Sequence, residues 1–296
     1  MKPEADPLSY LNEENINAAI SKPITRRDFL LGTARVLGGA ALVYEADGIL
    51  KKNANVPSKS EKTFSREIVN YPNAQFIWHN AACNPRVLAQ ALESTVNYIE
   101  IDVIPYKGQL IVADNLKDIE KMNKKDLEEQ RVDRILWTVL EKEKIPEFDV
   151  KIPKNDRRSV SDLMALVSAY VPGNTPVRYS GNFDVVGKLE VPVNSIITPT
   201  VGSARMSEYA KNVKSWAKID DGIKRGASVS MYMADNSDIL AINNENGLNT
   251  NVWVVDNVIT VLSFLKKGAT GITSGSAQVI RLATDPKYNP GLHHAA

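Results

Sequence analysis

A histidine and two neighbouring acidic residues are the first features of this sequence that could do chemistry. His79 is one of three histidines in the chain, and the other two lie in the C-terminal tail. Further along, Glu100 and Asp102 stand in the apolar, β-branched run Tyr98-Ile-Glu-Ile-Asp-Val103. Because side chains alternate between the faces of a strand, the two carboxylates share one face and the apolar residues take the other. A buried acidic face needs a positive partner, and a metal ion would serve, so the pattern indicates a metal-assisted hydrolase.

A third apolar run repeats this geometry. In Glu147-Phe-Asp-Val-Lys-Ile152, Asp149 and Lys151 alternate with apolar residues in the same way. Three carboxylates that face one interior would suit a hard cation such as Mg²⁺ or Ca²⁺, which prefers oxygen ligands. Two other interpretations stay open: the acids form a buried ion-pair network with Lys151, or Asp149 and Lys151 neutralise each other. His79 would then be a hydrogen-bonded histidine of the core.

Eight short apolar runs are the predicted strands that position these residues. They alternate with helix-length segments in which apolar residues recur at three- and four-residue spacing. The predicted strands are 76–81, 98–104, 146–152, 176–180, 194–199, 227–233, 250–255 and 271–274. This alternation predicts a single-domain (β/α)₈ TIM barrel, in which catalytic side chains lie at the C-terminal ends of the strands. A doubly wound open sheet is the alternative, but no G-x-G-x-x-G follows the first strand.

Length and composition are those of an ordinary globular chain. It has 296 residues, of which 43% are hydrophobic and 24% charged, and its formal net charge is +1. No global positive field therefore argues for nucleic acid or for an anionic membrane surface. Cys83 is the only cysteine, which excludes an intramolecular disulfide and a cysteine-based zinc cluster.

The N-terminal segment resembles a twin-arginine export signal. Thr25-Arg-Arg-Asp-Phe-Leu-Leu31 opens a weakly apolar stretch, residues 32–43, that is too short and too polar to span a membrane. We therefore expect residues 1–46 to direct export through the twin-arginine translocon to the periplasm or the outside. Residues 47–72 are then a linker, and 73–296 form the barrel. An amphipathic helix with an incidental arginine pair, in a cytoplasmic protein, is the alternative.

Five short motifs follow one another in a set order along the predicted barrel. They are W-H-x-A near the first strand, I-E-x-D-V, D-x-K, V-W-x-V-D and G-A-x-G-I-T, spread between Phe76 and Ile280. This order resembles the PLC-like phosphodiesterase barrels, which include the glycerophosphodiester phosphodiesterases and the spider-venom phospholipases D. The menorin-type branch of that superfamily is more similar still.

The resemblance implies that one divalent ion, Mg²⁺ or Ca²⁺, is bound by Glu100, Asp102 and Asp149. It also implies that His79 is one of two catalytic histidines that move protons. Lys151 would contact the substrate phosphate at the catalytic centre, and Trp253 would line the substrate pocket. The substrate would be a small-molecule or lipid phosphodiester, such as a glycerophosphodiester or a phospholipid head group, cleaved by hydrolysis or by cyclisation.

The sequence departs from that family pattern at two positions. The second histidine is expected after the second-strand hairpin, in Leu110-Ile-Val-Ala-Asp-Asn115, where Ala113 stands instead. The arginine usual after the first histidine is Asn80, which we group with Arg178 as a substrate-binding residue. Arg178 has an equal claim to be a surface or ion-paired side chain. Loss of a proton-transfer partner costs roughly 10²–10⁴ in rate, which Asp114 or Arg178 would have to offset. The alternative is a binding or scaffold protein on the same barrel.

Overall fold

The structure, a computed structural model, describes residues 59–201, 206–219, 221–236 and 238–285. The predicted export signal, residues 1–46, lies outside these ranges. Within them, no helix is both long enough and apolar enough to cross a membrane.

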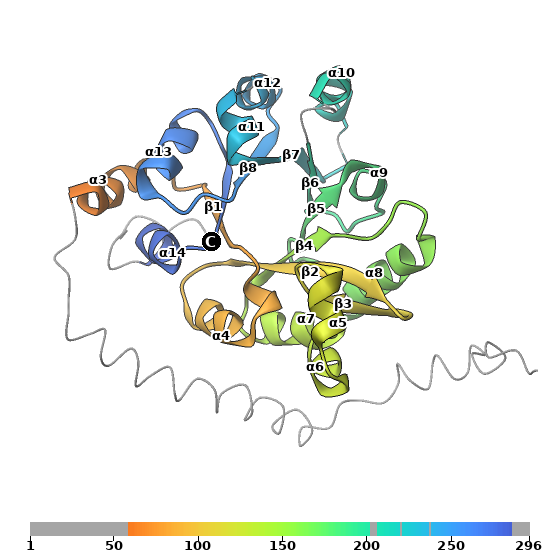
Figure 1. Cartoon of the computed structure of the whole chain (residues 1–296). Coiled ribbons are helices and arrows are strands. Elements are labelled where there is room, and N and C mark those ends of the chain that lie inside the picture. Colours follow the sequence, from red (N-terminus) through yellow and green to blue (C-terminus); the bar gives the residue numbers. More distant parts are fainter. Residues whose placement is uncertain (1–58, 202–205, 220, 237, 286–296) are drawn as a thin grey trace, which may run out of the picture. The chain divides into compact units, whose positions relative to one another are not determined.

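Eight parallel strands close into a barrel with helices on its outside (Figure 1). Around the barrel they are β1 (Gln75–Trp78), β2 (Tyr98–Tyr106), β4 (Ile145–Val150), β5 (Arg178–Asn182), β6 (Ile196–Thr200), β7 (Lys224–Ser230), β8 (Asn249–Trp253) and β9 (Gly271–Ser274). The sheet closes because β1 pairs with both β9 and β2. The predicted (β/α)₈ barrel is therefore confirmed, and each predicted strand overlaps one of these eight.

One further strand lies beside the barrel. β3 (Gln109–Val112) runs antiparallel to the second half of β2, where Tyr106 pairs with Gln109. The two residues between them, Lys107 and Gly108, have φ values of 48° and 76°, as a tight two-residue hairpin requires. The hairpin returns the chain to the C-terminal end of the barrel, and Asp114 follows directly after it.

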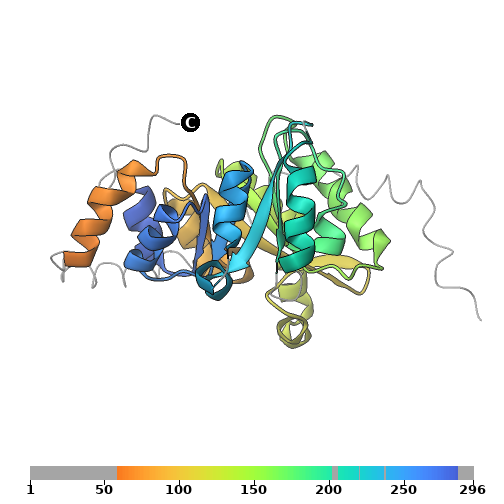
Figure 2. The same cartoon turned by 90° about the horizontal axis from the view of Figure 1, so that it is seen from above.

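Helices surround the strands, and Figure 2 shows them from a second direction. They are α4 (Pro85–Glu93), α5 (Leu116–Lys121), α6 (Lys124–Glu129), α7 (Val132–Glu141), α8 (Arg157–Tyr170), α9 (Phe183–Val186), α10 (Met206–Trp216), α11 (Met231–Asn236), α12 (Ile239–Glu245), α13 (Val258–Lys266) and α14 (Ala277–Thr284), with short 3₁₀ turns at Ile68–Asn70 and Ala81–Cys83. Asparagine side chains cap the first turns of α4, α6 and α13 and so set where these helices begin.

The segment that precedes the barrel differs from the prediction. Part of the linker expected over 47–72 is a helix, α3 (Lys59–Glu67). Phe64 and Ile68 lie one helical turn apart, and both are fully buried in the core. α3 contacts α13 and α14 and lies beside them in Figure 1 and Figure 2. It therefore belongs to the outer helical layer.

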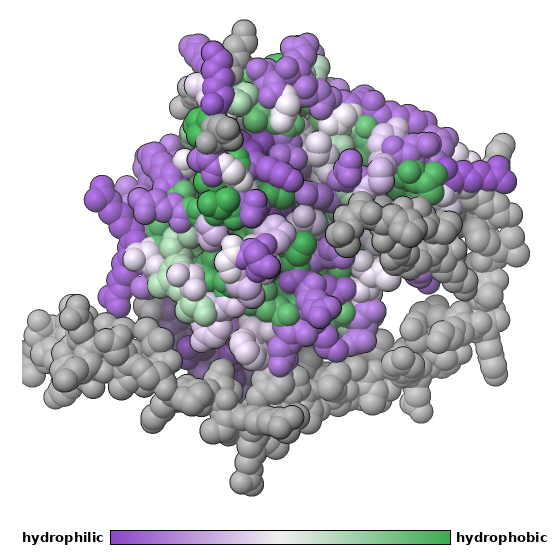
Figure 3. All heavy atoms as spheres, turned by 180° about the vertical axis from the view of Figure 1, so that it is seen from behind, coloured by the Kyte–Doolittle hydropathy of each residue, from purple (hydrophilic) through white to green (hydrophobic). Residues whose placement is uncertain are grey.

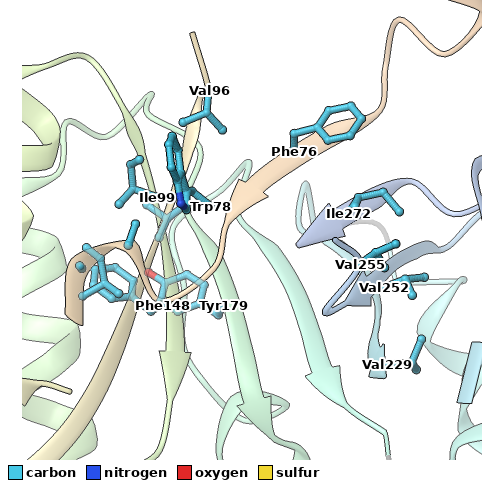
Figure 4. Close-up of a cluster of buried hydrophobic side chains, with 14 of the residues drawn as sticks. Phe76, Trp78, Val96, Ile99, Phe148, Tyr179, Val229, Val252, Val255 and Ile272 are labelled. Carbon is cyan, nitrogen blue, oxygen red and sulfur yellow. The ribbon is translucent and has the colours of Figure 1, made fainter. Parts of the chain in front are cut away.

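The apolar core fills the space between the barrel and its helices. Ile99, Ile101 and Val103 of β2 are all 0% exposed, on the face that the alternation assigns away from the acids. Figure 4 shows this layer, with Phe148 close to Tyr179 and with Val229, Val252 and Ile272 on successive strands. The rings of Phe148 and Tyr179 stack with their centroids 5.7 Å apart. The other strand faces point into the barrel and carry most of its buried polar residues.

Exposed large apolar side chains are spread over separate elements of the described surface. They are Val69, Leu116, Trp137, Val193, Ile219, Met231, Tyr232 and Ile259. On the face that Figure 3 shows, small apolar patches alternate with polar residues.

Candidate functional site

Three neighbouring strands bring the predicted site residues together at the C-terminal end of the barrel. His79 follows β1, Glu100 and Asp102 lie on β2, and Asp149 lies on β4. Asp102 and Asp149 are direct partners in the register between β2 and β4, so their side chains share one level of the interior. Lys151 extends β4, because its backbone N–H donates to Val103 O at 3.0 Å.

His79 and Glu100 form a close pair at this end of the barrel. Nδ1 of His79 lies 2.7 Å from Oε2 of Glu100, which also accepts the backbone N–H of Asn80 at 2.6 Å. Asn80 can present this N–H because its backbone is left-handed, with φ of 51°. Burial alone would lower the pKa of His79, but the hydrogen bond and charge of Glu100 outweigh burial and raise it.

The hydrogen bond also decides which nitrogen of the ring is available. Since Nδ1 is held by Glu100, Nε2 points away from that carboxylate. The imidazole is 28% exposed, whereas the Glu100 side chain is 8% exposed. His79 is therefore held in one orientation and can exchange a proton at Nε2.

Asp102 is the most deeply buried acid of the site, with a side chain that is 1% exposed. Its Oδ1 lies 2.6 Å from Lys151 Nζ, and its Oδ2 accepts the thiol of Cys83 at 3.1 Å. Burial, followed by the negative charge of Glu100, raises the pKa of Asp102, while Lys151 opposes this shift. Burial also raises the pKa of the Cys83 thiol, so the thiol stays protonated and acts as a donor.

Asp149 completes the acidic set. Burial, and then the charges of Glu100 and Asp102, raise the pKa of Asp149 to about 7. Its Oδ2 is 3.7 Å from Lys151 Nζ, a longer contact than the ammonium makes with Asp102. Lys151 alone faces three aspartates, Asp102, Asp114 and Asp149, so the acids of the site outnumber its lysine, which favours an added cation.

The segment expected to carry a second histidine presents a carboxylate instead. Ala113 is 1% exposed and packs in a small apolar cluster with Ile104, Ile111 and Ile119. The next residue, Asp114, reaches the site: its backbone oxygen accepts Lys151 Nζ at 2.7 Å and its Oδ1 does so at 3.1 Å. The hydrogen bond from Lys151 to the Asp114 side chain lowers the pKa of Asp114. Asp114 is ionised and faces His79, whose positive form it favours.

Arg178 lies apart from the catalytic candidates, deep in the barrel. Its guanidinium is 0% exposed, with Nε 3.2 Å from Oε2 of Glu147, and it also donates to the side chain of Gln75. Burial raises the pKa of Glu147 to about 8, while Arg178 opposes this shift. Glu147 was not among the predicted site residues, although its place two residues before Asp149 puts it on the same interior face. The ion-paired interpretation of Arg178 is the one that fits these contacts.

The two remaining predicted substrate-binding residues lie at the mouth. Trp253 ends β8, is half-buried, and pairs in register with Ser230. Asn80 contributes its backbone to Glu100, and its side-chain oxygen is buried without a hydrogen-bond partner among the described residues. An acceptor left in this state beside His79 is suited to a donor from a bound molecule.

The donor chemistry of the site fits a hard divalent ion. Glu100, Asp102 and Asp149 supply carboxylate oxygens, and an ammonium already stands between two of them as a cation. As the side chains lie, however, no three His, Cys, Asp or Glu side chains in the described ranges surround one point closely enough to hold an ion. The chemical types of these residues suit a hard divalent ion, and the Lys151 ammonium contacts two of the three carboxylates.

Comparison with known proteins places the fold. No protein-family model matches the chain, and no curated protein matches it in sequence. A phosphodiesterase of Oleispira antarctica, solved in complex with the product sn-glycerol-3-phosphate, is similar over 71% of this chain and 96% of its own, at 13% identity and a TM-score of 0.56. A glycerophosphodiester phosphodiesterase of Parabacteroides distasonis is similar over 69% and 93%, at 15% identity and a TM-score of 0.51. The chain therefore has the barrel fold found in glycerophosphodiester phosphodiesterase structures.

Proposed function

We propose that this protein is a phosphodiesterase whose site is the C-terminal mouth of the barrel. The observation that carries the proposal is the pairing of His79 with Glu100 beside three further acids and one lysine. A phosphodiester needs a proton donor for its leaving oxygen and positive charge for its phosphoryl oxygens. His79 supplies the first and Lys151 the second.

His79 is best suited to act as the general acid. Its raised pKa keeps more of the imidazolium at neutral pH, and Nε2 is the nitrogen free to give up the proton. In an in-line displacement, the attacking and leaving oxygens lie on opposite sides of phosphorus. One histidine therefore serves one of them, and the attacking oxygen has to be activated by another group.

The proposal includes one divalent ion, Mg²⁺ or Ca²⁺, held by Glu100, Asp102 and Asp149. When bound, such an ion would polarise the phosphoryl oxygens as a Lewis acid. The meeting of three carboxylates on neighbouring strands at this end of the barrel supports this assignment. Trp253 and Asn80 lie at the same end of the barrel and are the proposed contacts for the substrate outside its phosphate.

Glycerophosphodiesters are the substrate class to test first. The Oleispira antarctica phosphodiesterase binds sn-glycerol-3-phosphate as its product, and this chain shares its fold. A lipid-derived phosphodiester has the same reacting group, so the two differ in the part bound beyond the phosphate.

A leaving-group comparison tests the role of His79. With a glycerophosphodiester that releases an alcohol, His79→Ala should lower turnover by roughly 10²–10⁴. With a p-nitrophenyl phosphodiester, whose phenolate leaves without a proton, the loss should be much smaller. Equal losses on both substrates would remove His79 from the role of general acid.

The absence of a second histidine at Ala113 favours one other function, a binding protein for phosphate esters. Its signature would be saturable binding of sn-glycerol-3-phosphate by the wild type with no turnover of any phosphodiester in the presence of Mg²⁺ or Ca²⁺. Turnover that depends on His79 would exclude this function.

We also propose that the protein is exported through the twin-arginine translocon. The support is the arginine pair at Arg26 and Arg27 before a weakly apolar stretch. Residues 1–50 fused to a folded reporter should direct it out of the cytoplasm, and Arg26→Lys with Arg27→Lys should retain it. A reporter that stays in the cytoplasm in both forms would contradict export by this route.

A further inference from the structure

Lys151 occupies the centre of the acidic site rather than its edge. Four oxygen atoms of three aspartates surround Nζ: Asp102 Oδ1 at 2.6 Å, Asp114 O at 2.7 Å, Asp114 Oδ1 at 3.1 Å and Asp149 Oδ2 at 3.7 Å. Burial alone would lower the pKa of Lys151, but Asp102, Asp149 and Asp114 together outweigh burial and raise it. The ammonium is therefore a fixed positive charge within the carboxylate set.

An ion bound by Asp102 and Asp149 would compete with this ammonium for carboxylate oxygens. Carboxylate oxygens bind Mg²⁺ at about 2.0–2.1 Å and Ca²⁺ at about 2.3–2.6 Å. Asp102 is already within 2.6 Å of Nζ, and Asp102 and Asp149 both face the ammonium. For the two oxygens that now contact the ammonium, Asp102 Oδ1 and Asp149 Oδ2, to bind one ion, Nζ has to move away.

The surroundings of Lys151 provide a direction for that movement. Its backbone is fixed to β2, but its side chain is 29% exposed and has a flexible four-carbon stem. Asp102 at the inner end of its contacts is 1% exposed, whereas Asp114 at the outer end is 50% exposed. If Lys151 breaks its contact with Asp102 and keeps its contact with Asp114, the ammonium moves towards the mouth of the barrel.

We propose that Lys151 is a displaceable internal counter-ion. In the ion-free protein it forms ion pairs with Asp102 and Asp149, and a divalent ion binds by displacing it. Displacement turns the ammonium outward, to the place where the substrate phosphate arrives. This inference rests on the proposed function, because it states how the divalent ion and the Lys151 ammonium of that site reach their positions: the ion binds first and the ammonium then turns towards the substrate phosphate.

Ion binding by titration calorimetry, with MgCl₂ or CaCl₂ alone and no substrate, tests the competition. Lys151→Met should bind the ion at least tenfold more tightly than the wild type, which corresponds to about 1.4 kcal/mol of lost competition. Lys142→Met is the matched control, since Lys142 pairs with Glu93 and lies outside the site. It should bind the ion as the wild type does. If Lys142→Met also bound the ion more tightly, the change would follow from net charge alone and would contradict a specific competition by Lys151.

Amine labelling of the wild type tests the movement itself without relying on a variant. Lys151 should react with acetic anhydride severalfold faster in saturating Ca²⁺ than in EDTA, while Lys142 should react at the same rate in both. Unchanged or slower labelling of Lys151 with the ion bound would overturn the proposal. Absence of ion binding by both the wild type and Lys151→Met would overturn it as well.

These outcomes separate this inference from the proposed catalysis. Tighter binding by Lys151→Met with faster labelling, but no turnover of any phosphodiester, would support displacement and contradict the phosphodiesterase. Turnover that depends on His79, together with unchanged labelling of Lys151 when the ion binds, would support the phosphodiesterase and contradict displacement.

Discussion

The imidazole of His79 is held by Glu100 through Nδ1 at 2.7 Å, and the same carboxylate oxygen accepts the N–H of Asn80 at 2.6 Å. One buried acid therefore orients both the ring and the backbone of the loop that follows β1. This arrangement makes Glu100 a positioning group for His79, the proposed proton donor, as well as a proposed metal ligand.

The first prediction concerns the pKa of His79. Glu100→Gln removes the negative charge and leaves the burial in place, so the pKa of His79 in the ion-free protein should fall. Proton NMR titration of the imidazole measures it, with His79→Ala to assign the signal. An unchanged pKa would show that Glu100 does not control the ring.

The pair of His79 and Glu100 should also make the free energy of unfolding depend on pH, with the larger contribution at low pH. Because the pKa of His79 is raised on folding, its contribution to stability is fully present below the unfolded pKa and is lost as the pH rises through the folded pKa. The difference in free energy of unfolding between wild type and Glu100→Gln should therefore be larger at pH 6 than at pH 8.5. A difference that grows with pH would contradict this assignment.

A second prediction concerns the buried pair of Arg178 and Glu147. Arg178→Met leaves Glu147 without its partner inside the barrel and should lower the free energy of unfolding by roughly 3–5 kcal/mol. Glu147→Gln combined with Arg178→Met should recover part of this loss, because no unpaired charge remains. Urea unfolding of both variants measures the coupling. Losses that simply add would show that the two side chains act independently.

The sequence predicted the barrel and the faces of its strands well. Alternation in β2 and β4 separates Ile99, Ile101 and Val103 from the acids, and the structure buries all three apolar residues against the helices. A period of two identifies the face of each residue, since it depends only on neighbours along the chain.

The same periodicity does not predict which side chains on different strands form ion pairs with one another. Which interior acid meets which cation depends on the register between strands, and a local pattern does not contain the register. The sequence therefore pointed to Arg178 as a substrate contact or an ion-paired side chain, whereas its partner Glu147 was missed. The contact of Lys151 with Asp102 follows from the register between β2 and β4. The hairpin of β2 and β3 then brings Asp114 to Lys151.

A third prediction tests the contact between β4 and β5 beside Lys151. Gly181 has φ of 122°, and a Cβ there would lie 2.5 Å from Val150 O. Gly181→Ala should lower the free energy of unfolding by at least roughly 1–3 kcal/mol, because both the backbone conformation and the space oppose it. Gly173→Ala is the control, since no atom lies within 4 Å of its added Cβ. Equal stability of the two variants in urea would contradict the close approach.

The last prediction concerns Asp256, whose Oδ1 accepts three donors from the last residue of β9 and the two residues that follow it. These are Ser274 Oγ at 2.8 Å, Gly275 N at 2.8 Å and Ser276 N at 3.1 Å. Ser276 caps α14, and Ser274 O accepts the backbone N–H of His79 at 2.9 Å. The carboxylate therefore holds a turn that also supports the loop carrying the proposed proton donor.

Asp256→Ala should lower the free energy of unfolding by roughly 1–3 kcal/mol, because three donors lose a shared acceptor. Asp256→Asn keeps an oxygen in place and should lose less. Hydrogen exchange resolves the local effect: the amides of Gly275, Ser276 and His79 should exchange faster in Asp256→Ala. Asp162→Ala, which removes an exposed carboxylate from α8, should stay within about 0.5 kcal/mol of wild type. If Asp256→Ala matched that control in both measurements, the turn would be held by its backbone alone and His79 would not depend on it.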